Sequence, residues 1–182
     1  MMKYCKEIKL KDGKHCTLRS CTRADAEAVL AIFHLTHEQT DFLLTYPDEK
    51  SFTLEQEGDF LEGLDKSDGG IEMVAVLDGK FVGCAGFDAV GSKEKIKHRA
   101  EFGISVDKAY WGLGIGRALT KACIDCAKEA GYLQLELDVI AENKKAIALY
   151  ENEGFVEFGR NPRGFRTREG AWQELVLMRR EL

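Results

Sequence analysis

The stretch Val106-Asp-Lys-Ala-Tyr-Trp-Gly-Leu-Gly-Ile-Gly-Arg-Ala-Leu119 decides how this chain is interpreted. It follows an alternating run typical of a strand, Glu101–Val106, and leads into a segment with the apolar period of a helix. The helix must begin among three glycines, Gly112, Gly114 and Gly116. The first turn of a helix leaves N–H groups unpaired, and glycines remove the Cβ atoms that would block a diphosphate. The stretch therefore predicts that residues 112–117 bind a phosphorylated cofactor.

Three kinds of glycine-rich phosphate turn compete for this stretch. A P-loop needs Lys and then Ser or Thr after its last glycine, but Gly116 is followed by Arg117-Ala118. A dinucleotide-binding turn needs G-x-G-x-x-G directly after the strand, and its third glycine would fall on Arg117 or Leu119. The gap between the strand and the first glycine is also too long for that tight turn. The remaining pattern is the x-x-G-x-G turn that binds the diphosphate of coenzyme A.

At these residues the chain resembles the GNAT superfamily of N-acetyltransferases. The resemblance covers about residues 98–160. The matching motifs, in order, are Phe102–Val106, Gly112–Leu119, Leu135–Val139, Asn143–Tyr150 and Glu153–Phe155. The chain departs from the family at Trp111, where Gln or Arg is usual, although the main-chain donors do not depend on that side chain. The resemblance implies a co-substrate, acetyl-CoA.

The resemblance also implies which residues bind this cofactor. Strand 99–106 and strand 132–140 would splay apart, so that main-chain groups pair with the pantetheine arm and one amide meets the oxyanion. The implied cofactor-binding residues are Ile104, Ser105, Val106, Gly112, Leu113, Gly114, Ile115, Gly116, Arg117 and Asn143. Lys144 and Lys145 could reach the phosphates, but exposed cations are common at helix starts.

Tyr150 is the candidate for protonating the departing thiolate. Asn143 is placed to cap a helix over 144–152 and Gly154 to end it, so Asn143 and Tyr150 would lie on one helix face. A phenol of reference pKa ~10 can donate to a thiolate of reference pKa ~8.5 only modestly uphill. A core tyrosine with a satisfied hydroxyl explains the spacing equally well, and the resemblance favours the general acid.

The acceptor amine must lose a proton, and Glu101 is the candidate base because it begins the strand that would carry the acetyl group. In similar proteins an acid near this point serves as base, directly or through a water. The alternatives are that Glu101 is simply a charged residue at a strand end, or that His98 is the base.

The acceptor end of the site is weakly marked. Glu38, Asp41 and Phe42, with Tyr46 nearby, lie where relatives place the loop over the acceptor, and acids beside aromatic rings suit an ammonium group. A solvated loop explains each of these residues singly. Four arginines precede the last strand and favour an exposed hairpin loop over an anion site. They are Arg160, Arg163, Arg166 and Arg168.

Composition sets broad limits on function. The chain has 182 residues, 45% hydrophobic and 31% charged, which suits one globular domain over 1–182. A net charge of −5 argues against nucleic-acid binding. No apolar run suggests a membrane span or a signal peptide, so a cytoplasmic protein is expected. The four histidines show no ligand spacing, and the six cysteines are expected to be buried free thiols without metal.

The pattern of apolar residues and turn residues predicts an α/β domain with a mixed, mostly antiparallel sheet flanked by helices. Strands are expected at 16–20, 72–77, 81–90, 99–106, 132–140, 155–160 and 171–178. Helices are expected at 24–37, 51–64, 114–130 and 144–152, the second capped by Ser51.

The sequence thus predicts an acetyl-CoA-dependent N-acetyltransferase that acts by direct transfer in a ternary complex. The acceptor would be a primary amine of a small molecule, amino acid or peptide, and the chain could act as a monomer or as a homodimer. The rival interpretation is a coenzyme A-binding sensor or interaction module without turnover. A nicotinamide-dependent oxidoreductase is disfavoured by the glycine spacing.

Overall fold

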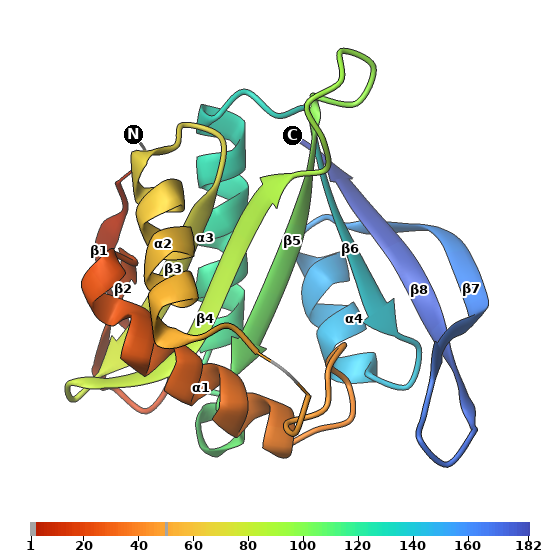
Figure 1. The fold of residues 1–182 in the computed structure, drawn as a ribbon, viewed down its shortest axis with the longest axis horizontal. Helices are drawn as coiled ribbons and strands as arrows, with labels where there is room; N and C mark the ends of the chain where they lie inside the picture. The colour runs from red at the N-terminus through yellow and green to blue at the C-terminus, as the bar shows by residue number, and fades with distance from the viewer. Residues whose placement is uncertain (1–2, 50) are drawn as a thin grey trace.

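The structure, a computed structural model, describes residues 3–49 and 51–182. Within these residues, one eight-stranded sheet runs in the order β1-β2-β3-β4-β5-β6-β8-β7 (Figure 1). The strands are β1 (Cys5–Lys9), β2 (His15–Ser20), β3 (Ile71–Leu77), β4 (Lys80–Ala89), β5 (Arg99–Val106), β6 (Gln134–Ile140), β7 (Val156–Arg166) and β8 (Trp172–Glu181). The helices are α1 (Ala26–Glu38), α2 (Leu54–Lys66), α3 (Ile115–Glu129) and α4 (Lys144–Asn152), with short 3-10 helices η1 (Arg23–Asp25) and η2 (Lys108–Tyr110).

The predicted fold class is confirmed, because all neighbouring strands pair antiparallel except β5 and β6, which are parallel. Helices lie on both faces of the sheet, with α1 and α2 in front and α3 behind in Figure 1. On the α3/α4 face, helix residues such as Leu119, Cys123 and Tyr150 pack with sheet residues such as Met73 and Phe102 in a large core. The α1/α2 face has a much smaller core, formed by Cys21, Ala26, Val29, Leu61 and Val74.

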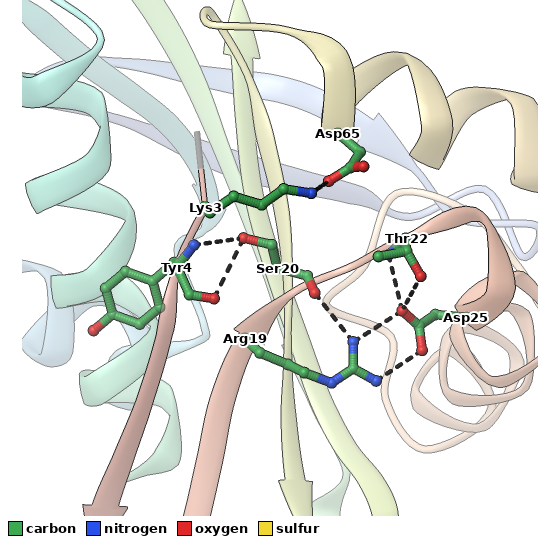
Figure 2. A network of polar contacts seen from close by, with 7 residues as sticks. All are labelled: Lys3, Tyr4, Arg19, Ser20, Thr22, Asp25 and Asp65. Carbon is green, nitrogen blue, oxygen red and sulfur yellow. Dashed lines mark hydrogen bonds and ion pairs between the residues drawn. The ribbon is translucent and has the colours of Figure 1, made fainter. Parts of the chain in front are cut away.

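The N-terminal edge differs from the sequence-based expectation, which began the sheet at residue 16. An additional strand, β1, pairs with β2 and forms the edge of the sheet. Figure 2 shows the polar contacts at this edge: the Tyr4 N–H donates to the Ser20 hydroxyl at 2.8 Å, and Lys3 pairs with Asp65. Arg19 makes two hydrogen bonds to Asp25, at 2.7 and 2.9 Å, which join β2 to η1.

The start of α2 was predicted three residues too early. Thr53, not Ser51, caps the helix, because its hydroxyl accepts the Gln56 N–H at 3.2 Å. The Gln56 side chain in turn accepts the Thr53 N–H at 2.9 Å. This capping box leaves Ser51 outside the helix.

The last hairpin is longer than predicted, since β7 and β8 continue beyond residues 160 and 178. Arg163 and Arg166 therefore belong to β7 together with Arg160, and the prediction of a hairpin loop is wrong for Arg163 and Arg166. Arg160 pairs with Glu157 and Glu174. Arg168 lies beyond the end of β7, in the hairpin loop. The guanidinium groups of Arg163 and Arg166 lie over the Trp172 ring, 5.3 and 5.5 Å from its centroid.

The six cysteines are all free thiols. Cys5 is exposed on the edge strand β1 and Cys84 is half-buried, so the prediction that all six are buried is wrong for these two residues. Cys123 and Cys126 are buried on the sheet side of α3, as their spacing predicts. Among residues 3–49 and 51–182, no group of three or more potential metal ligands occurs. No helix in the same residues is long and apolar enough to span a membrane.

Candidate active site

The glycine-rich turn joins β5 to α3 in a backbone conformation that favours glycine. Gly112 and Gly114 have φ values of 81° and 99°, and Gly114 is the N-cap of α3. A Cβ on either glycine would meet no atom within 4 Å, so these glycines serve backbone shape and open access. Gly116 lies beside α4: a Cβ there would make an ordinary contact, 3.4 Å from Leu149 Cδ1.

The main-chain N–H groups of this turn are free. No described residue accepts a hydrogen bond from the N–H groups of residues 112–117, and the first helical bond runs from the Ala118 N–H to the Gly114 carbonyl at 3.1 Å. Six consecutive donors at the positive end of a helix form a site for an anion the size of a diphosphate. The free donors therefore fit the pyrophosphate of coenzyme A.

Contacts from distant segments hold the turn in place. The Lys11 N–H donates to the Leu113 carbonyl at 3.1 Å. The Gln39 side chain donates to Asp107 Oδ1 at 2.9 Å and accepts the Lys108 N–H at 2.8 Å. None of these contacts uses an N–H group of residues 112–117, so those donors stay free.

Trp111 stands where the resembling family usually has Gln or Arg, and the structure gives it a role. Its indole N–H donates to the Val106 carbonyl at 2.7 Å, and the residue is 41% exposed. The tryptophan thus ties the start of the turn to the end of β5.

β5 and β6 separate beyond their first residues, as the sequence resemblance implied (Figure 1). They pair only from Arg99↔Gln134 to Glu101↔Glu136, although β5 runs on to Val106 and β6 to Ile140. The separated ends of the two strands leave an opening in the sheet, which we call the β5/β6 opening.

Hydrogen bonds outside the opening show which main-chain groups face it. The Asp107 N–H bonds to Val82 and the Val90 N–H to Arg99, so the odd-numbered residues of β5 bond to β4. Ile104 and Val106 therefore direct their N–H groups into the opening. The main chain of Ser105 pairs with Cys84 instead, contrary to its expected role in binding pantetheine.

Tyr150 comes from α4 and lies on the α3/α4 face beside β5. Its ring packs against Phe102 and Phe155, with centroid separations of 6.2 and 5.8 Å. The residue is 8% exposed, and its hydroxyl bonds to no described residue. Burial raises the pKa of the phenol, so it stays protonated at neutral pH. Asn143 accepts the Ala146 N–H at 3.2 Å, which confirms that it caps α4.

Glu101 and His98 lie at the opposite end of β5 from the glycine-rich turn. The Glu101 side chain is exposed on the α1/α2 face, whereas the neighbouring Phe102 side chain is buried in the α3/α4 core. Asp88 of β4 and Glu136 of β6 are its partners in register. The His98 carbonyl accepts the Leu133 N–H at 2.9 Å. The exposed Glu101 side chain and the Tyr150 ring therefore lie on opposite faces of the sheet.

The candidate acceptor residues lie at the end of α1 and in the segment that follows it, which reaches from the end of β5 to the β7–β8 hairpin. Asp41 lines a small pocket with Tyr46, Arg166 and other residues. Glu38 is exposed on the last turn of α1, and the Phe42 N–H bonds to the Thr40 hydroxyl at 3.2 Å. Neither Glu38 nor Phe42 lines the pocket.

Besides Arg160, two further cations among the predicted candidates pair with carboxylates. Arg168 makes hydrogen bonds of 2.6 and 2.9 Å to Asp48, and its N–H donates to the Tyr46 hydroxyl at 3.0 Å. Arg117 donates to Glu153 at 2.6 Å, which joins α3 to the end of α4. Its main-chain N–H is still one of the free donors of the turn.

The candidate site residues predicted from the sequence did not include Glu72 of β3. It is a lone acid in an apolar strand, and its carboxylate lies over Gly86 of β4. Burial, with Glu57 close by, raises the pKa of Glu72 to about 8. The signal in the sequence was the single Glu within Ile71–Leu77, which hairpin pairing places beside a glycine.

Comparisons with known proteins agree with this geometry. The acetyltransferase (GNAT) family matches residues 31–155. A GNAT-family acetyltransferase from Streptococcus pneumoniae has a TM-score of 0.88 and 29% identity, over 92% of this chain and 99% of that one. A ribosomal-protein-alanine N-acetyltransferase from Brucella melitensis has a TM-score of 0.80 and 31% identity. The match covers 91% of this chain and 99% of that one.

A third structure, a phosphinothricin acetyltransferase from Sinorhizobium meliloti, was solved in complex with acetyl-CoA. It shares the fold with a TM-score of 0.79 and 22% identity, over 92% of this chain and 88% of that one. The family match spans more than half of the chain and includes β5, the glycine-rich turn and α4. The chain therefore belongs to the acetyltransferase (GNAT) family, which confirms both the family and the enzyme class that the sequence predicted.

Proposed function

We propose that this protein transfers an acetyl group from acetyl-CoA to a primary amine by direct transfer in a ternary complex. The acceptor would be a small molecule, an amino acid or a peptide. The observation that carries the proposal is the run of six free N–H groups at residues 112–117, in the turn that follows β5 and the β5/β6 opening. A pyrophosphate bound at the turn would leave the thioester arm room to enter the opening.

Acetyl-CoA supplies an activated acyl group on a thiolate leaving group. The N–H groups of the turn would bind the pyrophosphate, and the free edge of β5 at Ile104 and Val106 would pair with the pantetheine arm. An N–H group on this edge would also stabilise the oxyanion. These main-chain groups are directed by strand pairing rather than by side-chain packing, so they are already in place before the ligand binds.

Tyr150 is the proposed proton donor to the thiolate. Its hydroxyl has no partner among the described residues, and its high pKa keeps the proton on the phenol until charge develops on sulfur. The aromatic contacts with Phe102 and Phe155 hold the ring beside β5. Asn143 would assist by keeping the first turn of α4 in place.

Glu101 is the proposed acceptor of the proton that the nitrogen releases as it attacks, directly or through a water. Its exposure on the α1/α2 face gives it contact with solvent, to which it can pass the proton. Asp41, with Glu38 and Phe42 in the same segment, is proposed to contact the acceptor. The named relatives act on different acceptors, a ribosomal-protein alanine and phosphinothricin, so the family alone does not select one.

The proposal is tested by following release of free thiol from acetyl-CoA with a panel of amines. The panel should contain phosphinothricin, several L-amino acids and a peptide with an N-terminal alanine. We expect one class of amine to accelerate thiol release and to yield an N-acetyl product by mass spectrometry. Tight acetyl-CoA binding without thiol release for any amine would instead support a coenzyme A-binding sensor.

A further inference from the structure

A strip of three residues crosses the α1/α2 face of the sheet and ends beside the β5/β6 opening. Strand pairing aligns Glu72 of β3 with Gly86 of β4, and Gly86 with Gly103 of β5. Side chains on adjacent strands are about 4.8 Å apart, so Glu72 and Gly103 are about 10 Å apart across the strip. The two glycines provide no side chain between the Glu72 carboxylate and the opening.

The carboxylate of Glu72 reaches across this strip. A Cβ on Gly86 would lie 2.2 Å from Glu72 Oε2, so the side chain occupies the space above that glycine. A Cβ on Gly103 would meet no atom within 4 Å, and Gly103 is exposed. The space next to the carboxylate is therefore open on the side that faces the opening.

Neighbouring groups make this carboxylate unusual. In the next row of the sheet, Cys84 contacts Glu72, and the Cys84 Sγ lies 3.4 Å from the Ser105 hydroxyl. Across the described residues, no Lys, Arg or His forms an ion pair with Glu72. The titratable groups that interact with it are Cys21 at the end of β2, Glu57 of α2, Cys84 of β4 and Cys123 of α3.

A half-buried acid that has no cationic partner among the described residues and lies next to open space is suited to receive a cation. Resting on the proposed acetyl transfer, we infer that Glu72 binds the ammonium group of the acceptor above Gly103 and removes its first proton. An arriving ammonium group supplies the missing positive charge and so favours the ionised carboxylate. The position is on the face opposite Tyr150, so acceptor and thiolate would meet through the opening from opposite sides.

The proton transfers balance. An ammonium group loses two protons when it becomes an amide nitrogen. In the inferred step one N–H bond breaks, its proton forms an O–H bond on Glu72, and the electron pair stays on nitrogen. The nitrogen then bonds to the acyl carbon, the C–S bond breaks, and Tyr150 donates its proton to sulfur. The second N–H proton leaves through Glu101. One of the two protons restores the phenol through solvent, and the other is released.

The test is the pH dependence of kcat/KM for the amine that the panel identifies as fastest, at saturating acetyl-CoA. Wild type should show a limb that rises with pH around a midpoint near 8. Glu72→Gln should remove this limb and lower kcat/KM about 100-fold above the midpoint, with KM for acetyl-CoA unchanged. Glu57→Gln should move the limb to lower pH, because it removes the adjacent like charge. A Glu72→Gln enzyme with the wild-type limb and rate would overturn the inference.

A second variant covers the case in which Glu72→Gln does not fold. Gly103→Ala adds one methyl group to open space, so it should fold and raise the acceptor KM about tenfold without changing acetyl-CoA affinity. An unchanged acceptor KM would contradict the inferred position.

If no amine is acetylated, the proposed function fails, and the site can still be examined alone. Methylamine should lower the titration midpoint of Glu72 in ¹³C NMR spectra of wild type, with Glu72→Gln or Glu57→Gln identifying the signal. A midpoint that methylamine does not move would reject Glu72 as an ammonium site.

Discussion

The two faces of the sheet are built in different ways. The α3/α4 face has the large core, and the acetyl-CoA site proposed there consists of main-chain groups, whose positions follow from strand pairing and from the N-terminus of α3. The α1/α2 face has a small core and carries single acids, Glu57, Glu72 and Glu101, on three different elements. The proposed cofactor face is thus defined by backbone geometry, and the proposed acceptor face by individual side chains that only the fold brings together.

The sharpest test of this contrast is Tyr150→Phe. Tyr150 is the one side chain on the α3/α4 face to which the proposed mechanism gives a proton-transfer role. Loss of the hydroxyl should reduce kcat about 10² to 10⁴-fold, the range for general acid catalysis. The affinity for acetyl-CoA should stay within about twofold, since the main-chain donors are unchanged. Steady-state kinetics with isothermal titration of acetyl-CoA measure both quantities.

Tyr132→Phe is the matched control. The Tyr132 hydroxyl donates to the Gly69 carbonyl at 2.6 Å, so this tyrosine has a structural partner where Tyr150 has none. Its loss should cost about 1 kcal/mol of stability and leave kcat unchanged. Equal losses of kcat in the two variants would mean that packing, not proton donation, explains the effect at Tyr150.

The free energy of unfolding should depend on pH because of Glu72, the half-buried acid on the proposed acceptor face. The folded-state pKa of Glu72, about 8, lies above the ordinary value of 4.5, so the folded protein binds this proton more tightly than the unfolded chain. Stability should therefore fall as pH rises from about 4.5 to about 8, by an amount on the order of a few kcal/mol.

Glu72→Gln should remove this loss, because the amide does not ionise. Urea unfolding of wild type and variant at pH values below and above this window measures the difference. The variant should gain stability relative to wild type only toward the alkaline end. A constant difference at all pH values would show that Glu72 is solvated like a surface carboxylate, and the contrast between the faces would weaken.

The glycine-rich turn is tested by Gly114→Ala, with Gly131→Ala as its matched control. Both glycines have positive φ, 99° and 85°, and in both cases a Cβ would meet no atom within 4 Å. Each variant should lose about 1–2 kcal/mol of stability, because alanine is strained in the left-handed region. Only Gly114→Ala should weaken acetyl-CoA binding, by roughly tenfold, since Gly131 follows the opposite end of α3. Calorimetric titration of both variants separates backbone strain from the site itself.

These two faces also differ in how well the sequence predicts them. Gly112, Gly114 and Gly116 reveal the turn because the chemistry needs positive φ and a helix N-terminus at adjacent positions. The cap at Asn143 is equally local. A function that resides in consecutive residues leaves a pattern in the sequence that elementary geometry can interpret.

The acceptor face left no such pattern. Glu72 and Gly103 are far apart in the chain, and only the register of β3, β4 and β5 aligns them. Ser105 illustrates the opposite error: its position in the motif suggested a main chain open to the cofactor, but alternation along β5 turns it toward β4. Register is a property of paired strands, so one strand alone did not disclose it.

The smallest expected effect is that of Arg117→Ala. This substitution separates the contribution of the Arg117 side chain to acetyl-CoA affinity from that of its main-chain N–H. The guanidinium group is largely exposed and donates to Glu153, so its loss should cost no more than about 1 kcal/mol of stability. The Arg117 N–H remains in the alanine variant. Acetyl-CoA affinity should therefore fall less than about tenfold, and the difference should shrink as salt screens the exposed charge. A loss much larger than that of Gly114→Ala would mean that a side chain, rather than the backbone, dominates binding on the α3/α4 face.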